Sequence, residues 1–180
     1  VIAMARDKVV PELEKAIDIL DKSTDILRRF KREISLITAL DRKALAYQSR
    51  GEYQEALRAF EEAKLLAEKN EYIPGTVFGN MGALYIVMGD WKNAIASTEK
   101  AVTFFRGKGD KNRETLYLGN IATAHVELKD FDAAEKIFQE IIPLARELGL
   151  KVNEGLFLGN FGDCLMQSGQ YERAEECFLQ

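Results

Sequence analysis

The sequence predicts an all-α fold, an α-solenoid built from tandem helix–turn–helix units. Three observations predict it. A segment recurs every 40 residues, apolar residues within each copy fall at helical spacing, and only three prolines occur among 180 residues. The recurring segment covers residues 78–95, 118–135 and 158–175. A fixed period of this length is typical of repeat architectures, in which each unit packs mainly on its neighbours.

Several columns of residues keep their register between the copies. The turn column separates two helices in each copy, because a chain that leaves a helix often needs the left-handed conformation that glycine adopts readily. In one copy Lys129 replaces this glycine. The columns are Gly79, Gly119 and Gly159; Asn80, Asn120 and Asn160; Gly82, Ala122 and Gly162; Gly89, Lys129 and Gly169; Trp91, Phe131 and Tyr171; and Ala94, Ala134 and Ala174.

Each unit is therefore expected to hold a helix A before the turn and a helix B after it. The expected A helices cover residues 33–50, 74–88, 112–128 and 152–168, and the expected B helices cover 13–30, 53–69, 91–106, 131–147 and 171 onward. Pro143 should bend its B helix, because proline removes a backbone hydrogen bond. We expect the chain to form a single array over residues 1–180, with units at 1–32 (partial), 33–72, 73–110, 111–150 and 151–180 (truncated).

The best-formed copy contains Ala44, Tyr47, Gly51, Tyr53, Ala56 and Phe60, and this pattern resembles the tetratricopeptide repeat. The period of 40 exceeds the usual 34 of that family. The Leu-Gly-Asn triplets at 118–120 and 158–160 resemble a longer subclass that includes Pins-type adaptors, kinesin light chains and bacterial peptide-pheromone receptors. The resemblance implies a right-handed superhelix whose concave surface is lined by A helices. HEAT-type repeats, the rival α-solenoid, lack this spacing of glycine, aromatic residue and alanine.

Composition and charge narrow the classes of partner. The net charge is −4, from 25 basic and 29 acidic side chains, so no basic field favours nucleic acid or an anionic membrane surface. No apolar run approaches the roughly 20 residues that cross a bilayer. The two cysteines, Cys164 and Cys177, suit a reducing compartment better than a disulfide framework. We expect a cytoplasmic protein that binds neither nucleic acid nor membranes.

Motifs that would indicate catalysis are scarce. The single histidine, His125, cannot form a paired-histidine metal site, and no phosphate-binding Gly-x-x-x-x-Gly-Lys loop occurs. Asp110, Asn112 and Glu114 alternate like calcium ligands, but Thr115 stands where a calcium loop needs glycine, so we interpret them as a solvated loop. The sequence thus predicts no enzyme activity, no catalytic residues, no metal and no cofactor.

The asparagine column is the one feature that packing does not readily explain. Asparagine and glycine in mid-helix each cost up to about 1 kcal/mol relative to alanine, yet the Gly-Asn pair recurs three times. The resemblance places these asparagines along the concave groove, where an amide side chain could pair with both N–H and C=O of a ligand backbone. An alternative is that each asparagine bonds to its neighbouring helix or to water. The expected groove residues are Asn80, Asn120, Asn160, Arg42, Thr76, Ala83, Val87, Leu116, Thr123, Glu127, Leu156, Asp163 and Gln167.

The functional hypothesis is a scaffold that binds a protein or an extended peptide in this groove. Two alternatives stay open. The chain could be a structural segment with end-to-end self-association, through apolar surface left by Leu165, Cys177 and Phe178 at a truncated last unit. It could also be the regulatory sensor domain of a larger signalling protein. The short last unit suggests that the chain is a fragment.

Overall fold

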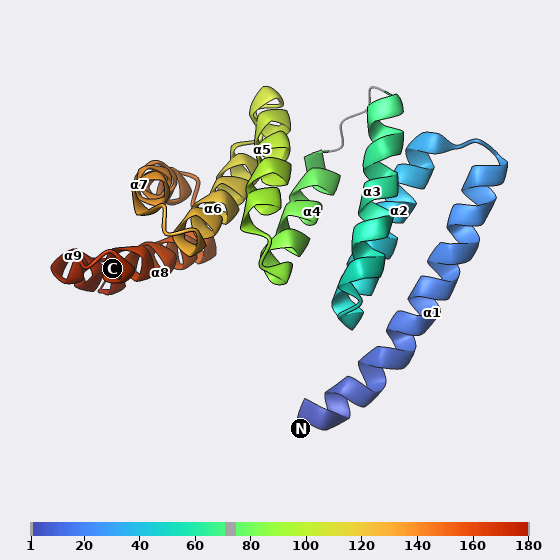
Figure 1. Ribbon diagram of the computed structural model, residues 1–180, viewed down its shortest axis with the longest axis horizontal. Coiled ribbons are helices and arrows are strands. Elements are labelled where there is room, and N and C mark those ends of the chain that lie inside the picture. Colours follow the sequence, from blue (N-terminus) through green and yellow to red (C-terminus); the bar gives the residue numbers. More distant parts are fainter. Residues whose placement is uncertain (1, 71–74, 180) are drawn as a thin grey trace. The chain divides into compact units, whose positions relative to one another are not determined.

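The computed structural model describes the backbone of residues 2–70 and 75–179, and side chains from residue 11 onward (Figure 1). Within these residues the chain is helical and contains no β-strand. The helices in chain order are α1 (Ile2–Arg29), α2 (Glu33–Arg50), α3 (Tyr53–Lys69), α4 (Gly75–Met88), α5 (Trp91–Gly107), α6 (Lys111–Glu127), α7 (Phe131–Glu147), α8 (Lys151–Gln167) and α9 (Tyr171–Phe178).

The predicted helices are confirmed, with the A helices at α2, α4, α6 and α8 and the B helices at the odd-numbered positions. Their starts agree within one residue except for α1, which begins at Ile2 rather than at residue 13. Residues 2–12 lie outside the repeat columns, and α1 continues through Pro11. Helix α7 likewise continues through Pro143 to Glu147, so neither proline ends its helix.

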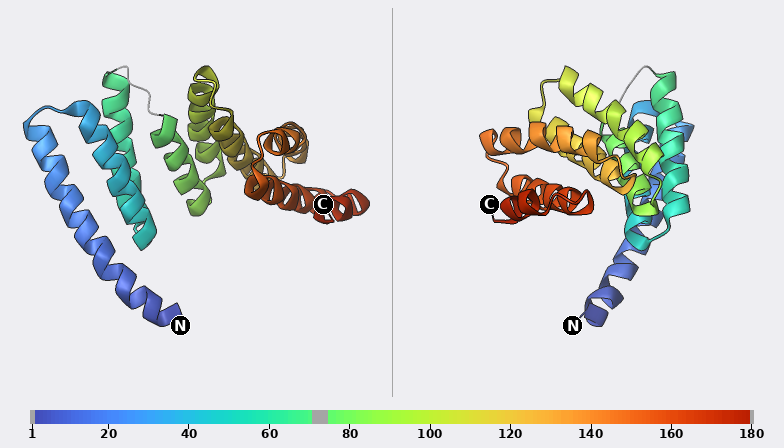
Figure 2. Two further views of the ribbon diagram at one scale, coloured as in Figure 1. Left: turned by 180° about the vertical axis from the view of Figure 1, so that it is seen from behind. Right: turned by 60° about the vertical axis from the view of Figure 1, so that its left-hand side comes forward.

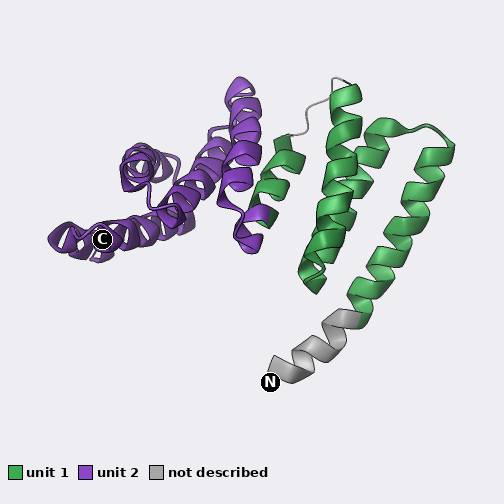
Figure 3. Cartoon of the chain, viewed as in Figure 1, with its two compact units in different colours: residues 1–84 green, residues 85–180 purple. Residues whose placement is uncertain are grey.

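The chain divides into two compact units, residues 1–84 and 85–180, with the boundary inside α4 (Figure 3). In unit 1, α1 packs on α2 and α2 on α3, and the last two lie side by side in both views of Figure 2. In unit 2 each helix from α5 to α9 packs on the next, and the A helices α6 and α8 also contact each other. Consecutive packing of this kind is what a repeat array requires.

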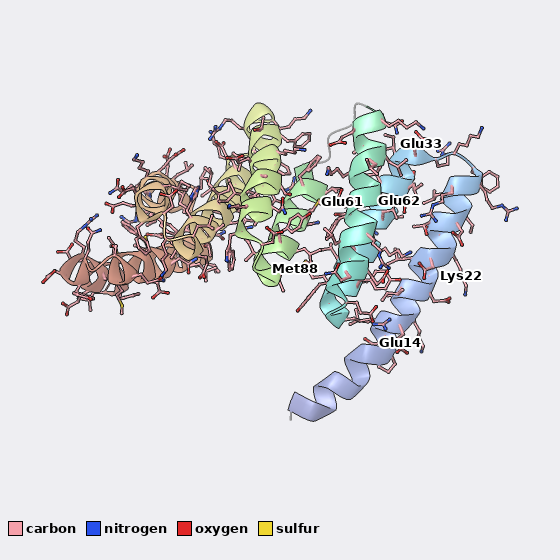
Figure 4. The ribbon with its side chains drawn as sticks, in the orientation of Figure 1. Glu14, Lys22, Glu33, Glu61, Glu62 and Met88 are labelled. Atoms are coloured by element: carbon pink, nitrogen blue, oxygen red, sulfur yellow. The ribbon has the colours of Figure 1, made fainter. Side chains whose placement is uncertain are left out.

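Surface ion pairs connect helices in unit 1. Glu62 of α3, labelled in Figure 4, lies 2.7 Å from the guanidinium of Arg28 on α1. Glu33 at the start of α2 lies 2.6 Å from the ammonium group of Lys69 at the end of α3. These side chains are largely exposed, so each pair contributes at most about 1 kcal/mol and the buried apolar face carries the packing.

Small side chains of the repeat columns lie at the helix contacts. Ala56, Ala94 and Ala134 are completely or almost completely buried. A Cβ atom on Gly119 of α6 would lie 2.3 Å from Cε1 of Phe157 on α8, so only glycine fits beneath that ring. In the same way the ring of Phe178 occupies the space above Gly162. Close approach of an aromatic ring therefore explains the glycines at positions 119 and 162.

The apolar surface expected at the last unit is smaller than the sequence indicated. Leu165 and Cys177 are buried in unit 2, which corrects the expectation for both residues. Phe178 remains 50% exposed, since only one side of its ring packs on Gly162. Helix α9 packs on α8 and buries its Ala174 and Cys177.

The loop residues that resembled calcium ligands have structural roles instead. The Asp110 carboxylate caps α6 by accepting a hydrogen bond from the backbone N–H of Arg113. Glu114 is buried, with its side chain 3% exposed, and accepts hydrogen bonds from Arg106 at 2.7 Å and Lys111 at 2.7 Å. Burial favours a raised pKa of Glu114, but the bonds from Lys111 and Arg106 outweigh it, so this pKa lies below its usual value. The interpretation of Glu114 as solvated loop was therefore wrong.

The turn column adopts the left-handed backbone in every copy. Its φ angles are 81° at Gly51, 74° at Gly89, 60° at Lys129 and 83° at Gly169. Lys129 is thus a side-chain-bearing residue in a conformation that favours glycine. A second left-handed position recurs in the connections from helix B to the next helix A, at Lys31, Gly109 and Gly149.

Replacing Lys129 with glycine should stabilise the protein by about 0.5 to 1 kcal/mol, because relief of the left-handed strain exceeds the entropy cost of glycine in the unfolded chain. Lys129→Ala is the matched control, since it removes the same charge and keeps a Cβ atom at φ 60°. Thermal and urea unfolding of both variants provide the measurement. A lower melting temperature for Lys129→Gly than for Lys129→Ala would contradict the strain argument.

Candidate functional site

Two parallel rows of side chains lie on neighbouring A helices of unit 2. On α6 the row is Leu116, Asn120, Thr123 and Glu127, and positions i, i+4, i+7 and i+11 share one helix face. The row on α8 repeats it 40 residues later as Leu156, Asn160, Asp163 and Gln167. All eight are exposed or half-buried, and α6 contacts α8 directly. We call the surface formed by these eight residues the unit 2 groove.

A small cavity of about 80 Å³ lies between the two rows. Six residues line the cavity, and the sequence predicted five of them as groove residues. The cavity is lined by Thr123, Val126, Glu127, Asn160, Asp163 and Gln167. Val126 was missed because it belongs to the buried apolar positions of α6, which carry no polar signal. The sequence spacing thus predicted the neighbours across this part of the groove.

The three asparagines of the column differ in their hydrogen bonds. The Asn160 amide donates to the Thr123 hydroxyl at 3.3 Å, and the Asn80 amide donates to the Asp41 carboxylate at 3.0 Å. Both bonds run to the preceding A helix, as the alternative interpretation supposed. Among the described side chains no hydrogen bond involves the Asn120 amide. An amide has one acceptor and two donors, so all three retain capacity for further bonds.

The two sides of the unit 2 groove have opposite character. Along one side the side chains of Leu116 and Leu156 are 41% and 59% exposed. Along the other side lie Glu127 and Asp163, both exposed and, within the described part of the chain, without an ion pair. Helix α6 ends at Glu127 and helix α8 at Gln167. The negative ends of both helix dipoles therefore add to the negative potential there.

The groove residues of unit 1 are arranged differently. Arg42 on α2 is exposed and borders a cavity of about 340 Å³ between α1 and α2. On α4, Thr76 is exposed, and Asn80 and Ala83 are half-buried. Val87, further along α4 and within unit 2, is exposed. None of the predicted groove residues is buried. The cavity beside Arg42 is otherwise lined by Leu20, Ser23, Leu27, Ser35, Thr38 and Ala39, which the sequence did not single out.

Asp41 is a further residue of this surface that the sequence did not reveal. Burial raises the pKa of Asp41, and the hydrogen bond from Asn80 and the nearby charge of Arg42 offset part of that rise. The hydrogen-bond partner of Asp41 lies 39 residues away in the sequence, so no local sequence pattern could have indicated this interaction.

Comparison with known families agrees with this geometry. Models described as tetratricopeptide repeat match residues 36–69, 75–147 and 157–180, together well over half of the chain. The chain belongs to the tetratricopeptide-repeat family. None of the curated proteins compared with this chain matches it. The resemblance drawn from the glycine, aromatic and alanine columns is thereby confirmed.

Solved structures of tetratricopeptide-repeat proteins share the fold. A putative kinesin light chain from Podospora anserina, with nearly identical repeats, matches with a TM-score of 0.83 at 16% identity, over 98% of this chain and 88% of that one. A signal-transduction ATPase of Pyrococcus horikoshii with a tetratricopeptide-repeat sensor matches with a TM-score of 0.81 at 17% identity, over 92% and 26%. The apo quorum sensor NprR from B. thuringiensis matches with a TM-score of 0.73 at 16% identity, over 94% and 49%. NprR in complex with its cognate peptide NprX matches with a TM-score of 0.70 at 19% identity, over 91% and 49%.

The cysteine and histidine side chains of this tetratricopeptide-repeat array lie outside the predicted groove residues. Cys164 and Cys177 are free thiols, and burial raises the pKa of Cys164 to about 11, with the negative charge of Glu135 adding to the rise. His125 lies 3.1 Å from the carboxylate of Asp130, the residue that caps α7. Over the described residues no cluster of His, Cys, Asp and Glu could hold a metal ion. No helix in that part of the chain is both long and apolar enough to cross a bilayer.

Proposed function

We propose that this array is a scaffold that binds a protein or peptide partner. In this proposal an extended segment of the partner crosses from one A helix to the next, and the asparagines bind its backbone. The observation that carries the proposal is the Asn120 amide. It lies half-buried in the centre of the unit 2 groove, has no hydrogen bond among the described side chains, and sits at a mid-helix position where asparagine is unfavourable.

Geometry and chemistry support an extended ligand. Packed helices lie about 8 to 10 Å apart, and an extended chain rises about 3.3 Å per residue, so Asn120 and Asn160 on α6 and α8 would meet the ligand about three residues apart. An amide side chain can pair with backbone N–H and C=O together, which holds a strand without reading its side chains. NprR, a protein of the same fold, has been solved in complex with a peptide, and this agrees with the proposed class of partner.

The alternative functions predict different observations. A purely structural asparagine column bonds each amide to the neighbouring helix or to water, and the bonds of Asn80 and Asn160 are interhelical. A self-associating segment would show a mass that rises with protein concentration. A sensor domain would be joined to further domains in its full gene. Asn120 favours ligand binding, because stability gives no evident reason for an asparagine there.

Replacing Asn120 with alanine tests the proposal. We expect binding to weaken by roughly 1 to 3 kcal/mol, since the ligand's backbone groups would be desolvated without a partner. The melting temperature should stay level or rise, because alanine is the better helix former. Peptides selected from a library on the immobilised chain serve as probes, and affinity and melting temperature are measured on the same preparations.

The matched control is Asn112→Ala, an exposed asparagine in the first turn of α6 outside the groove, which should leave affinity unchanged. A destabilised Asn120→Ala variant that binds the selected peptides normally would disprove the proposed role of the asparagine.

A further inference from the structure

The asparagines would bind the backbone of a ligand and would not distinguish its side chains. The side chains on the two walls of the unit 2 groove would make that distinction. Resting on the proposed function, we infer that this groove selects extended segments in which an apolar residue stands directly beside a basic residue. The apolar side chain would lie against Leu116 and Leu156, and the basic side chain against Glu127 and Asp163.

The apolar wall consists of two leucines that the repeat places at equivalent positions. Leu116 and Leu156 each lie one turn before an asparagine of the column and are 41% and 59% exposed, although most large apolar residues of α6 and α8 are buried. The two leucines stand at equivalent positions of α6 and α8, two helices that contact each other. An apolar ligand side chain that covers either leucine gains about 25 cal/mol per Å² of apolar surface removed from water.

The acidic wall consists of two carboxylates and two helix ends. Glu127 and Asp163 are exposed and, among the described residues, form no ion pair, whereas many other carboxylates of unit 2, such as Glu135 and Glu154, do. The carboxyl-terminal ends of α6 and α8 lie on this side, so the negative ends of two helix dipoles favour a cation there. A lysine or arginine side chain is the complementary ligand group.

The asparagines between the walls determine how a ligand would present its side chains. If Asn120 or Asn160 pairs with backbone N–H and C=O, one edge of the extended segment faces the floor of the groove. Neighbouring side chains of an extended segment point to opposite sides, so consecutive residues are directed toward opposite walls. An adjacent apolar and basic pair therefore satisfies both walls at once, whereas a pair of the same character satisfies only one.

Four acetylated and amidated peptides with one alanine–serine host sequence test the inference. One carries an adjacent Leu-Lys pair, one Leu-norleucine, one Leu-Glu and one Leu-Ala-Lys. Each is titrated into the isotope-labelled chain, and backbone amide shifts give the dissociation constant even for weak binding. At low salt we expect the Leu-Lys peptide to bind about fivefold more tightly than the norleucine peptide, and the other two to bind more weakly still. Raising the salt from about 0.01 M to about 0.15 M should reduce this preference for lysine.

Matched variants locate the effect. Glu127→Gln with Asp163→Asn should remove the preference for lysine over norleucine. Glu140→Gln with Glu147→Gln, an equal charge change at exposed positions of α7, should preserve it. Leu116→Ala with Leu156→Ala should weaken both peptides alike. Melting temperatures confirm that each double variant folds, and the six substituted side chains are exposed, so folding should be preserved.

The outcomes separate this inference from the proposed function. Equal affinity for the lysine and norleucine peptides, with binding that still depends on Asn120, would overturn the inference and leave the scaffold proposal standing. Equal affinity for the adjacent and spaced pairs would overturn the adjacency. Failure of the Leu-Lys peptide to bind would also overturn the inference, while the library screen with Asn120→Ala judges the proposed function independently.

Discussion

Replacing Gly119 with alanine is expected to lower the free energy of unfolding by about 2 kcal/mol. The added Cβ atom would lie 2.3 Å from Cε1 of Phe157, a ring that is only 4% exposed and cannot turn aside without disturbing the contact between α6 and α8. Overpacking of this kind costs about 1 to 3 kcal/mol and exceeds the gain of about 1 kcal/mol in helix propensity. Urea unfolding followed by circular dichroism measures the loss.

Gly159 is a matched control, because it occupies the same column as Gly119 in the next repeat. No atom lies within 4 Å of a Cβ built there, so Gly159→Ala should be neutral or stabilising by up to about 1 kcal/mol. The two substitutions are chemically identical and differ only in what lies above the glycine. Equal effects of the two variants would show that the Phe157 ring does not require glycine at 119.

Replacing Asn80 with alanine is expected to destabilise unit 1 by about 1 to 3 kcal/mol near neutral pH. The variant removes the amide that donates to Asp41, and a largely buried carboxylate is then left without that donor. This result would differ from that of Asn120→Ala, although the two asparagines occupy the same column. Thermal and urea unfolding of both variants under identical conditions provide the comparison.

The pH dependence of Asn80→Ala follows from Asp41. Burial already places the pKa of Asp41 above its usual value, and loss of the Asn80 bond, which lowers this pKa, should raise it further. For a group whose folded pKa exceeds its unfolded pKa, stability is retained while both states are protonated and is lost as the pH rises through the folded value. The deficit of Asn80→Ala should therefore be largest near neutrality and shrink on acidification. A deficit that stays constant from about pH 4 to about pH 7, relative to Asn120→Ala, would contradict this account.

Much of the fold was predictable because its signals are local. The turn column marks positions with φ near 60° to 83°, and few residues other than glycine adopt that conformation easily, so the turns at Gly51, Gly89 and Gly169 are visible in the sequence. The B helices α3, α5 and α9 begin two residues after these glycines, which explains why their starts were predicted correctly. The start of α1 was missed because no turn glycine precedes it.

Residues that act through distant partners were not predictable in this way. Glu114 was interpreted as solvated because its neighbours in sequence are polar, yet Arg106, eight residues earlier, closes an ion pair over it. Asp41 drew no attention because its donor lies 39 residues away. The neighbours across the unit 2 groove were predictable, since a fixed period places equivalent residues of α6 and α8 side by side.

The sequence by itself determined the two-helix repeat, its period and its turns, because backbone conformation and helical periodicity depend on residues close together in the chain. Only the tertiary structure decided which members of a column have partners. Asn80 and Asn160 are bonded to the preceding A helix, while Asn120 has no such bond among the described side chains. Gly119 lies beneath a ring, while Gly159 faces open space. Identical residues at equivalent repeat positions have different partners, because hydrogen bonds and close contacts depend on side chains of the neighbouring repeat. The residues adjacent in sequence do not determine those contacts.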